Sequence, residues 1–104
     1  PKTDGPNEGT NPEQLFAAAW GACFQGALLA VGRQADVDVT DSTVKVEVAL
    51  GADPEGGFGL AAKIMVEIPG VDREKAQELV NAAHAACPYS KATRGNIDVE
   101  VLVV

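Results

Sequence analysis

The segment from residue 12 to residue 34 constrains the fold most, because a helix formed from it would be apolar nearly all round. After Gln14 it reads LFAAAWGACF and then GALLAVG, and only Gln25 interrupts this run before Arg33. A helix with one exposed side carries a polar stripe, so this helix must be enclosed on most sides. A domain of 104 residues is small for wrapping one helix completely. We therefore expect a subunit interface to provide the remaining cover.

Either of two residues could be the N-cap of this helix. If Thr10 is the N-cap, Glu13 falls at the third helical position and completes a capping box, which gives Glu13 a structural role. If Asn11 is the N-cap, Pro12 takes the favoured first position instead. The polar segment before it, PKTDGPNEG, predicts a loop or linker.

The rest of the chain predicts further elements in a clear order. Alternating apolar residues predict strands over residues 43–50 and 58–68, joined by a Gly- and Pro-rich turn into an antiparallel hairpin. Asp72 is a good N-cap for a second helix, which Pro88 ends before opening a short helix through Thr93. Residues 97–104 alternate as a last strand. We predict one α+β domain over residues 1–104, with an antiparallel sheet packed on a long, buried central helix.

Charge and composition exclude several classes of partner. The chain has 15 acidic and 8 basic residues and a net charge of −7, which argues against nucleic acid or an anionic membrane surface. Its longest apolar stretch, residues 15–31, is interrupted by Gln25 and is marginal in length for a membrane span. With no signal peptide visible, we expect a cytoplasmic protein.

Cys23 and Cys87 lie far apart in the sequence and do not form a CxxC motif. Cys23 stands in the apolar run, where a small buried side chain is the first interpretation. Cys87 stands where one helix ends and the next begins, so it is either a half-exposed capping residue or a thiol with thiolate character. Local chemistry thus favours Cys87 as the more reactive thiol. If the two meet in the cytosol, a reversible disulfide is favoured over a static one.

Other polar residues near Cys87 have simpler interpretations. His84, three residues before Cys87, could pair with the thiol, but a solvated or hydrogen-bonded helical histidine is favoured. Lys91 and Arg94 are predicted to be surface charges. No cluster of histidines and carboxylates predicts a metal site.

Two segments carry a family resemblance. GTNPEQLFAAAWGACFQGAL (residues 9–28) and CPYSKATRGNIDVEV (residues 87–101) resemble the two signature segments of the organic hydroperoxide resistance (Ohr) proteins in the OsmC-like superfamily. The resemblance implies an intertwined homodimer and a thiol peroxidase without a bound cofactor. It makes Cys23 the peroxidatic cysteine and Cys87 the resolving cysteine of a Cys23–Cys87 disulfide, which overrules the local preference for Cys87. Dihydrolipoyl groups, such as dihydrolipoamide or lipoylated proteins, are the implied reductant.

The same resemblance assigns further site residues. Glu13 matches the active-site glutamate that orients an arginine against the thiolate. Ten residues of helix separate Glu13 from Cys23 by about 15 Å, so we expect Glu13 to serve the partner subunit's thiolate. An apolar lining from Phe16, Trp20 and Phe24 would suit alkyl or fatty-acyl hydroperoxides.

The chain departs from the family pattern at its beginning. Family members begin with a strand-rich segment that carries the catalytic arginine, and we expect this part of the family domain to be absent here. Arg33, Arg73 and Arg94 do not match that arginine. A buried thiol with no cation nearby tends to stay protonated. The alternative function is a non-catalytic dimeric module that binds small hydrophobic molecules, with inert cysteines.

Overall fold

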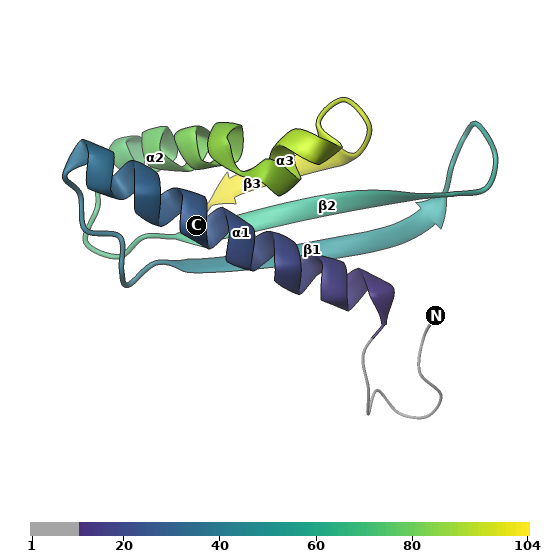
Figure 1. Ribbon diagram of the computed structural model, residues 1–104, viewed down its shortest axis with the longest axis horizontal. Helices are drawn as coiled ribbons and strands as arrows, with labels where there is room; N and C mark the ends of the chain where they lie inside the picture. Colours follow the sequence, from purple (N-terminus) through teal and green to yellow (C-terminus); the bar gives the residue numbers. More distant parts are fainter. Residues whose placement is uncertain (1–10) are drawn as a thin grey trace.

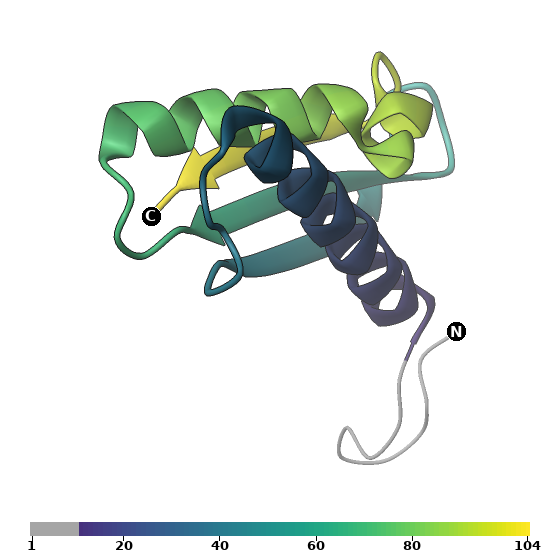
Figure 2. The ribbon, with the colours of Figure 1, turned by 60° about the vertical axis from the view of Figure 1, so that its left-hand side comes forward.

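The computed structural model describes residues 11–104, which form three helices on one face of a three-stranded sheet (Figure 1). The elements are α1 (Pro12–Ala35), β1 (Thr43–Ala52), β2 (Phe58–Glu67), α2 (Arg73–Ala86), α3 (Pro88–Thr93) and β3 (Asp98–Val103). This order is the one predicted. Figure 2 shows the two layers, with α1 crossing the sheet obliquely and α2 lying along it. The α+β class is therefore confirmed.

Asn11 begins helix α1. Its Oδ1 accepts a hydrogen bond of 2.9 Å from the backbone N–H of Gln14, and Pro12 occupies the first helical position. The second capping alternative is thus confirmed, while Thr10 and the loop predicted over residues 1–9 lie outside the described residues. Glu13 falls at the second helical position, so the capping box does not explain its presence.

The sheet is mixed, which corrects the expectation of an antiparallel sheet. Strands β1 and β2 form the predicted antiparallel hairpin, with Val46 opposite Ile64. Strand β3 pairs with β2 in parallel, with Val101 opposite Ile64. The chain leaves β2 and returns through α2 and α3 before entering β3, and such a crossover aligns the two strands in the same direction.

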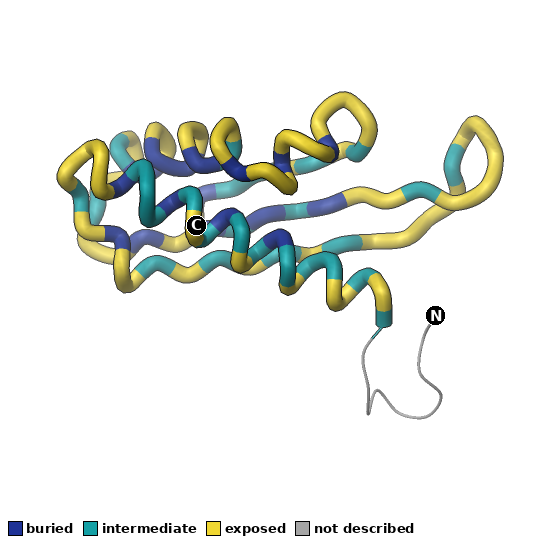
Figure 3. Tube along the Cα trace, in the orientation of Figure 1, coloured by how far each residue is buried: buried dark blue, intermediate teal, exposed yellow. Residues whose placement is uncertain are grey.

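The core lies between the sheet and the helices. Helix α1 contributes a single buried stripe at helical spacing, consisting of Trp20, Phe24, Leu28 and Gly32 (Figure 3). It packs with inward-facing residues of β2 and α2, among them Ile64, Val66, Leu79, Val80 and Ala83. Full burial of one large apolar side chain stabilises a fold by about 1.5–3 kcal/mol. This stripe therefore fixes the position of α1, and with it Cys23.

Helix α1 is less enclosed than its sequence predicts, because β1, α2 and α3 cover only one of its sides. Leu15 is 60% exposed, and Ala18, Ala22 and Gly26 are exposed at four-residue intervals. By length and composition α1 is apolar enough to cross a membrane, a property that core helices of soluble proteins share. The expectation of a buried central helix thus holds for one stripe of this chain.

Candidate active site

The fold brings the two cysteines together. Cys23 lies in the middle of α1, and Cys87 lies at the junction where α2 ends and α3 begins. Their Sγ atoms are 3.5 Å apart, and both thiols are free. A disulfide has a sulfur–sulfur distance of about 2.05 Å, so bond formation needs an approach of roughly 1.5 Å. The pair is placed for a reversible disulfide.

The two thiols differ in exposure, and in the opposite sense to the one local chemistry predicts. Cys87 is completely buried, whereas Cys23 is partly exposed. The interpretation of Cys87 as half-exposed is wrong, and the interpretation of Cys23 as a buried side chain holds only in part. The reason is the packing of the α2–α3 junction against α1, which covers the Cys87 side chain. A solute can therefore reach Cys23 more readily than Cys87.

The surroundings of Cys23 favour its protonated form. Burial raises the pKa of the Cys23 thiol, and the neighbouring Cys87 raises it further. The backbone N–H of Tyr89, in the first turn of α3, hydrogen-bonds the Cys23 sulfur and lowers this pKa in part. No positive charge from residues 11–104 contributes to the Cys23 pKa.

Two of the arginines donate hydrogen bonds away from the thiols. Arg73 donates to the carbonyl of Val103 at 2.9 Å, and Arg94 donates to the carbonyl of His84 at 2.9 Å. Lys91 and Arg94 are exposed, which confirms them as surface charges. No arginine among residues 11–104 contributes to the Cys23 pKa.

His84 is hydrogen-bonded, as favoured from the sequence. Its Nδ1 lies 2.8 Å from the hydroxyl oxygen of Ser90, which also accepts a bond of 3.1 Å from Trp20 Nε1. Burial lowers the pKa of His84, and the nearby Arg94 charge lowers it further. Ser90 was not singled out from the sequence; its position three residues after Cys87, one helical turn on, is the only signal for it.

Three aromatic residues were predicted to line a substrate pocket. Phe16 is partly exposed, with its ring centroid 5.4 Å from Trp20 and 6.2 Å from Tyr89. Trp20 and Phe24 are completely buried in the core. The role of Trp20 and Phe24 toward a substrate stays a prediction.

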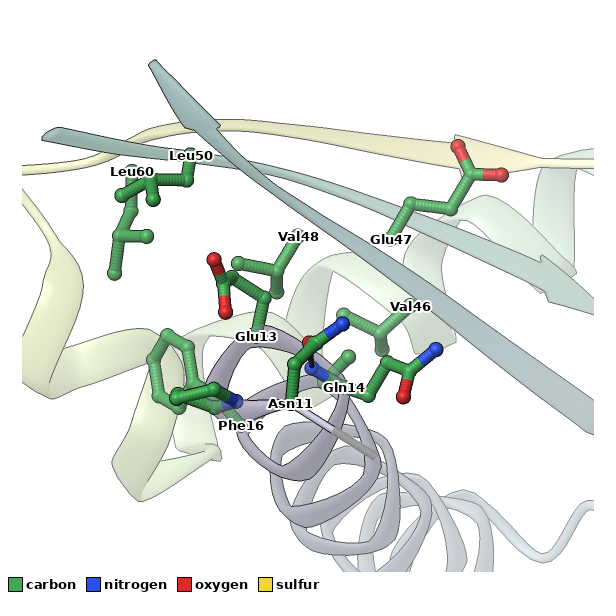
Figure 4. Close-up of a pocket in the computed structure, with 11 residues that line it drawn as sticks. Asn11, Glu13, Gln14, Phe16, Val46, Glu47, Val48, Leu50 and Leu60 are labelled. Carbon is green, nitrogen blue, oxygen red and sulfur yellow. Dashed lines mark hydrogen bonds between the residues drawn. The ribbon is translucent and has the colours of Figure 1, made fainter. Parts of the chain in front are cut away.

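A pocket of about 1070 Å³ opens between the start of α1 and the hairpin. Its lining is largely apolar and consists of Asn11, Pro12, Glu13, Gln14, Phe16, Ala17, Val46, Glu47, Val48, Leu50 and Leu60. Figure 4 shows the Glu13 carboxylate pointing from α1 toward the strands, on the side of Val48 and Leu50. Within residues 11–104 no hydrogen bond or ion pair reaches this carboxylate. Glu13 thus lies in the pocket with Phe16, apart from the thiols of its own chain.

The described residues offer no metal site. Among residues 11–104 there is no group of three or more His, Cys, Asp or Glu side chains that could hold a metal ion.

Comparisons with known proteins identify the family. The model of the OsmC-like protein family matches residues 5–102. The organic hydroperoxide resistance protein OhrB of Bacillus subtilis is 54% identical over 94 residues, which cover 89% of this chain and 68% of that protein. The organic hydroperoxide resistance protein of Xanthomonas axonopodis pv. citri is 48% identical over 88% of this chain and 65% of its own length. The chain thus spans about two thirds of the length of these relatives.

Solved structures agree with the sequence matches. The crystal structure of Bacillus subtilis OhrB superposes with a TM-score of 0.89 at 52% identity, covering 94% of this chain and 73% of that one. An organic hydroperoxide resistance protein from Elizabethkingia anophelis gives a TM-score of 0.90 at 45% identity, covering 95% and 71%. These matches confirm the OsmC-like fold. The chain belongs to the OsmC-like family and, within it, to the organic hydroperoxide resistance proteins.

Proposed function

We propose that this chain reduces organic hydroperoxides to alcohols through a Cys23–Cys87 dithiol and disulfide couple. The observation that carries the proposal is the sulfur pair, 3.5 Å apart, with Cys23 partly exposed and Cys87 buried. The names of the relatives support a role in hydroperoxide detoxification, since they are organic hydroperoxide resistance proteins.

In the first step the Cys23 thiolate attacks the outer oxygen of the hydroperoxide. The sulfur gives an electron pair to that oxygen, the O–O bond breaks, and the alkoxide takes up a proton and leaves as the alcohol. Cys23 is oxidised to a sulfenic acid. The partial exposure of Cys23 supports its assignment to this step, because the attacking sulfur must meet a solute.

In the second step the Cys87 sulfur attacks the Cys23 sulfenic acid. A sulfur–sulfur bond forms, and the hydroxyl group leaves as water. Each turnover therefore converts two thiols and one hydroperoxide into a disulfide, an alcohol and water. Burial of Cys87 keeps it away from peroxide, so that it reacts with the sulfenic acid next to it.

A dithiol must then reduce the disulfide. We propose dihydrolipoyl groups, either free dihydrolipoamide or those carried on lipoylated proteins, as that external reductant, with no cofactor bound to the chain. The dithiol transfers two electrons and two protons and is itself oxidised to a cyclic disulfide. The basis for this choice is the resemblance of the two cysteine segments to the Ohr proteins.

Thiolate formation near neutral pH needs a positive charge beside Cys23, and residues 11–104 do not supply one. We propose that Glu13 orients such a charge at the thiolate of a partner subunit in a homodimer. Two observations support this. The Glu13 carboxylate has no partner among the described residues, and it lies about 15 Å along α1 from its own Cys23.

A homodimer also agrees with the exposed surface of the chain. The small residues Ala18, Ala22 and Gly26 leave room for a second backbone along α1, while Phe58 is 78% exposed on the hairpin. A second copy that covered these surfaces would complete the enclosure that the sequence of α1 requires.

A peroxide consumption assay tests the proposed function. With dihydrolipoamide in excess, the chain should consume tert-butyl hydroperoxide over many turnovers, and omission of the dithiol should stop consumption after one equivalent. The alternative, a non-catalytic module that binds small hydrophobic molecules, is favoured by the apolar pocket and by the raised pKa of Cys23. Thiol counts that peroxide leaves unchanged would favour that alternative.

A further inference from the structure

Two side-chain contacts join α1 to α3, one helical turn apart. Trp20 and Cys23 are three residues apart on α1, and Cys87 and Ser90 are three residues apart at the start of α3. The Trp20 indole Nε1 lies 3.1 Å from Ser90 Oγ, and the Cys23 sulfur lies 3.5 Å from the Cys87 sulfur. The hydrogen bond and the sulfur pair therefore fix the same two segments against each other.

The Trp20–Ser90 hydrogen bond lies fully inside the protein. Trp20 is 0% exposed and Ser90 is 1% exposed. The indole N–H can only donate, so the Ser90 oxygen accepts it and the Ser90 hydroxyl hydrogen remains available. His84 Nδ1 lies 2.8 Å from the same oxygen and can accept that hydrogen when the proton of neutral His84 is on Nε2. Ser90 Oγ thus has a polar contact with both Trp20 and His84.

We propose that the Trp20–Ser90 hydrogen bond, supported by His84, positions Cys87 for disulfide formation with Cys23. Trp20 and Ser90 are positioning residues, because they act through the segments that carry the two sulfurs. This positioning role rests on the proposed function for its physiological meaning. The contacts from which it is inferred concern only the Cys23–Cys87 pair and the Trp20–Ser90 hydrogen bond.

The effect follows from what holds α3 in each redox state. In the disulfide state the covalent bond itself ties α3 to α1. In the dithiol state the six-residue helix α3 depends on noncovalent contacts, of which the buried hydrogen bond is one. Loss of this bond loosens the dithiol state more than the disulfide state, so that ring closure has to order more of the chain. The equilibrium then shifts toward the dithiol.

Equilibration with oxidised and reduced dithiothreitol measures this shift. The protein dithiol and oxidised dithiothreitol exchange for the protein disulfide and reduced dithiothreitol, and acid quenching followed by mass spectrometry gives the ratio. Ser90→Ala and Trp20→Phe should each lower the equilibrium constant for disulfide formation by about three- to tenfold, as expected for one buried hydrogen bond. The double variant should resemble the single variants, because both remove the same bond.

Ser42→Ala is the matched control. Ser42 Oγ accepts a hydrogen bond of 2.8 Å from Gln25 Nε2, another side chain of α1, without joining α1 to α3. Its disulfide equilibrium should equal that of the wild type. Ser90→Ala removes the Trp20–Ser90 hydrogen bond from the side of α3, and Trp20→Phe removes it from the side of α1. If one of these variants does not fold, the other still tests the positioning role.

The positioning role is overturned if the folded Ser90→Ala or Trp20→Phe variant keeps the wild-type equilibrium, or if Ser42→Ala shifts it equally. No peroxide takes part in this measurement. The two proposals can therefore fail separately. If the wild type consumes no hydroperoxide but the variants show the predicted shift in disulfide equilibrium, the proposed function is wrong and the positioning role stands.

Discussion

The sulfur of Cys23, on the partly exposed side of α1, lies 3.5 Å from the sulfur of Cys87, which no solvent reaches. In the proposed reaction, a hydroperoxide that approaches from solvent meets Cys23 first, and the oxidised Cys23 has Cys87 already beside it. The proposal therefore gives the two cysteines different roles, which predicts different results for variants of each.

Replacement of each cysteine by serine should give different results. Cys23→Ser should consume no tert-butyl hydroperoxide, because the attacking sulfur is gone. Cys87→Ser should consume about one equivalent and then stop at the sulfenic acid, which dimedone traps and mass spectrometry locates on Cys23. Equal residual consumption by the two variants would contradict the assigned roles.

The thiol of Cys23 should titrate late when residues 11–104 alone surround it. Burial raises its pKa, and no cation among the described residues opposes that shift, so the fraction of thiolate is small at neutral pH. In the Cys87→Ser variant, the rate of alkylation by iodoacetamide should still rise between about pH 8 and pH 10. A rate that levels off below pH 8 would mean that the described residues do not set the Cys23 pKa and that a positive charge, such as the one Glu13 is proposed to orient, lies beside the thiol.

His84 should make the stability of the fold depend on pH. Its pKa is lowered in the folded chain, so the unfolded chain takes up the proton first as the pH falls through about 6.5. The stability that neutral His84 provides is therefore present above that pH and is lost as the pH falls toward the lower, folded-state pKa. Urea unfolding of the wild type and of His84→Gln should show a difference in free energy that shrinks from pH 7.5 to pH 5 (about the range in which histidine titrates). A difference in unfolding free energy that stays constant over this range would show that His84 does not cause the pH dependence of stability.

Two residues at the start of α1 should respond differently to substitution, because Asn11 has a structural role and Glu13 is a candidate site residue. Asn11→Ala removes the side-chain cap and should lower the free energy of unfolding by about 1 kcal/mol. Glu13→Gln removes only a charge without a partner in the described chain and should change it by less than about 0.5 kcal/mol. Urea titration of both variants checks this, and a larger loss for Glu13→Gln would return Glu13 to a structural role.

The local elements of this fold could be predicted from the sequence, because their signals are local. The alternation of β1 and β2 and Pro88 at the start of α3 mark their own positions, and Asn11 with Pro12 was one of two possible starts of α1. The direction of β3 could not be read in the same way. Alternation gives a strand its two faces, whereas its direction depends on the crossover through α2 and α3.

The candidate site could likewise be predicted only in part from the sequence. Both cysteines were found, but their exposures were misjudged, since burial of Cys87 results from packing between segments that are remote in the sequence. Ser90 was missed for the same reason. Its hydrogen bond to Trp20 joins residues 70 positions apart, and a serine in the short helix α3 carries no local sign of such a partner.

The most direct test of the account is a peptide map after treatment with one equivalent of tert-butyl hydroperoxide. The protein is alkylated, digested without reduction and examined by mass spectrometry. The account predicts a disulfide that joins the Cys23 peptide to the Cys87 peptide of the same chain, and addition of dihydrolipoamide should restore both thiols. Two thiols that remain alkylatable after the treatment, or a disulfide that only links separate chains, would contradict it.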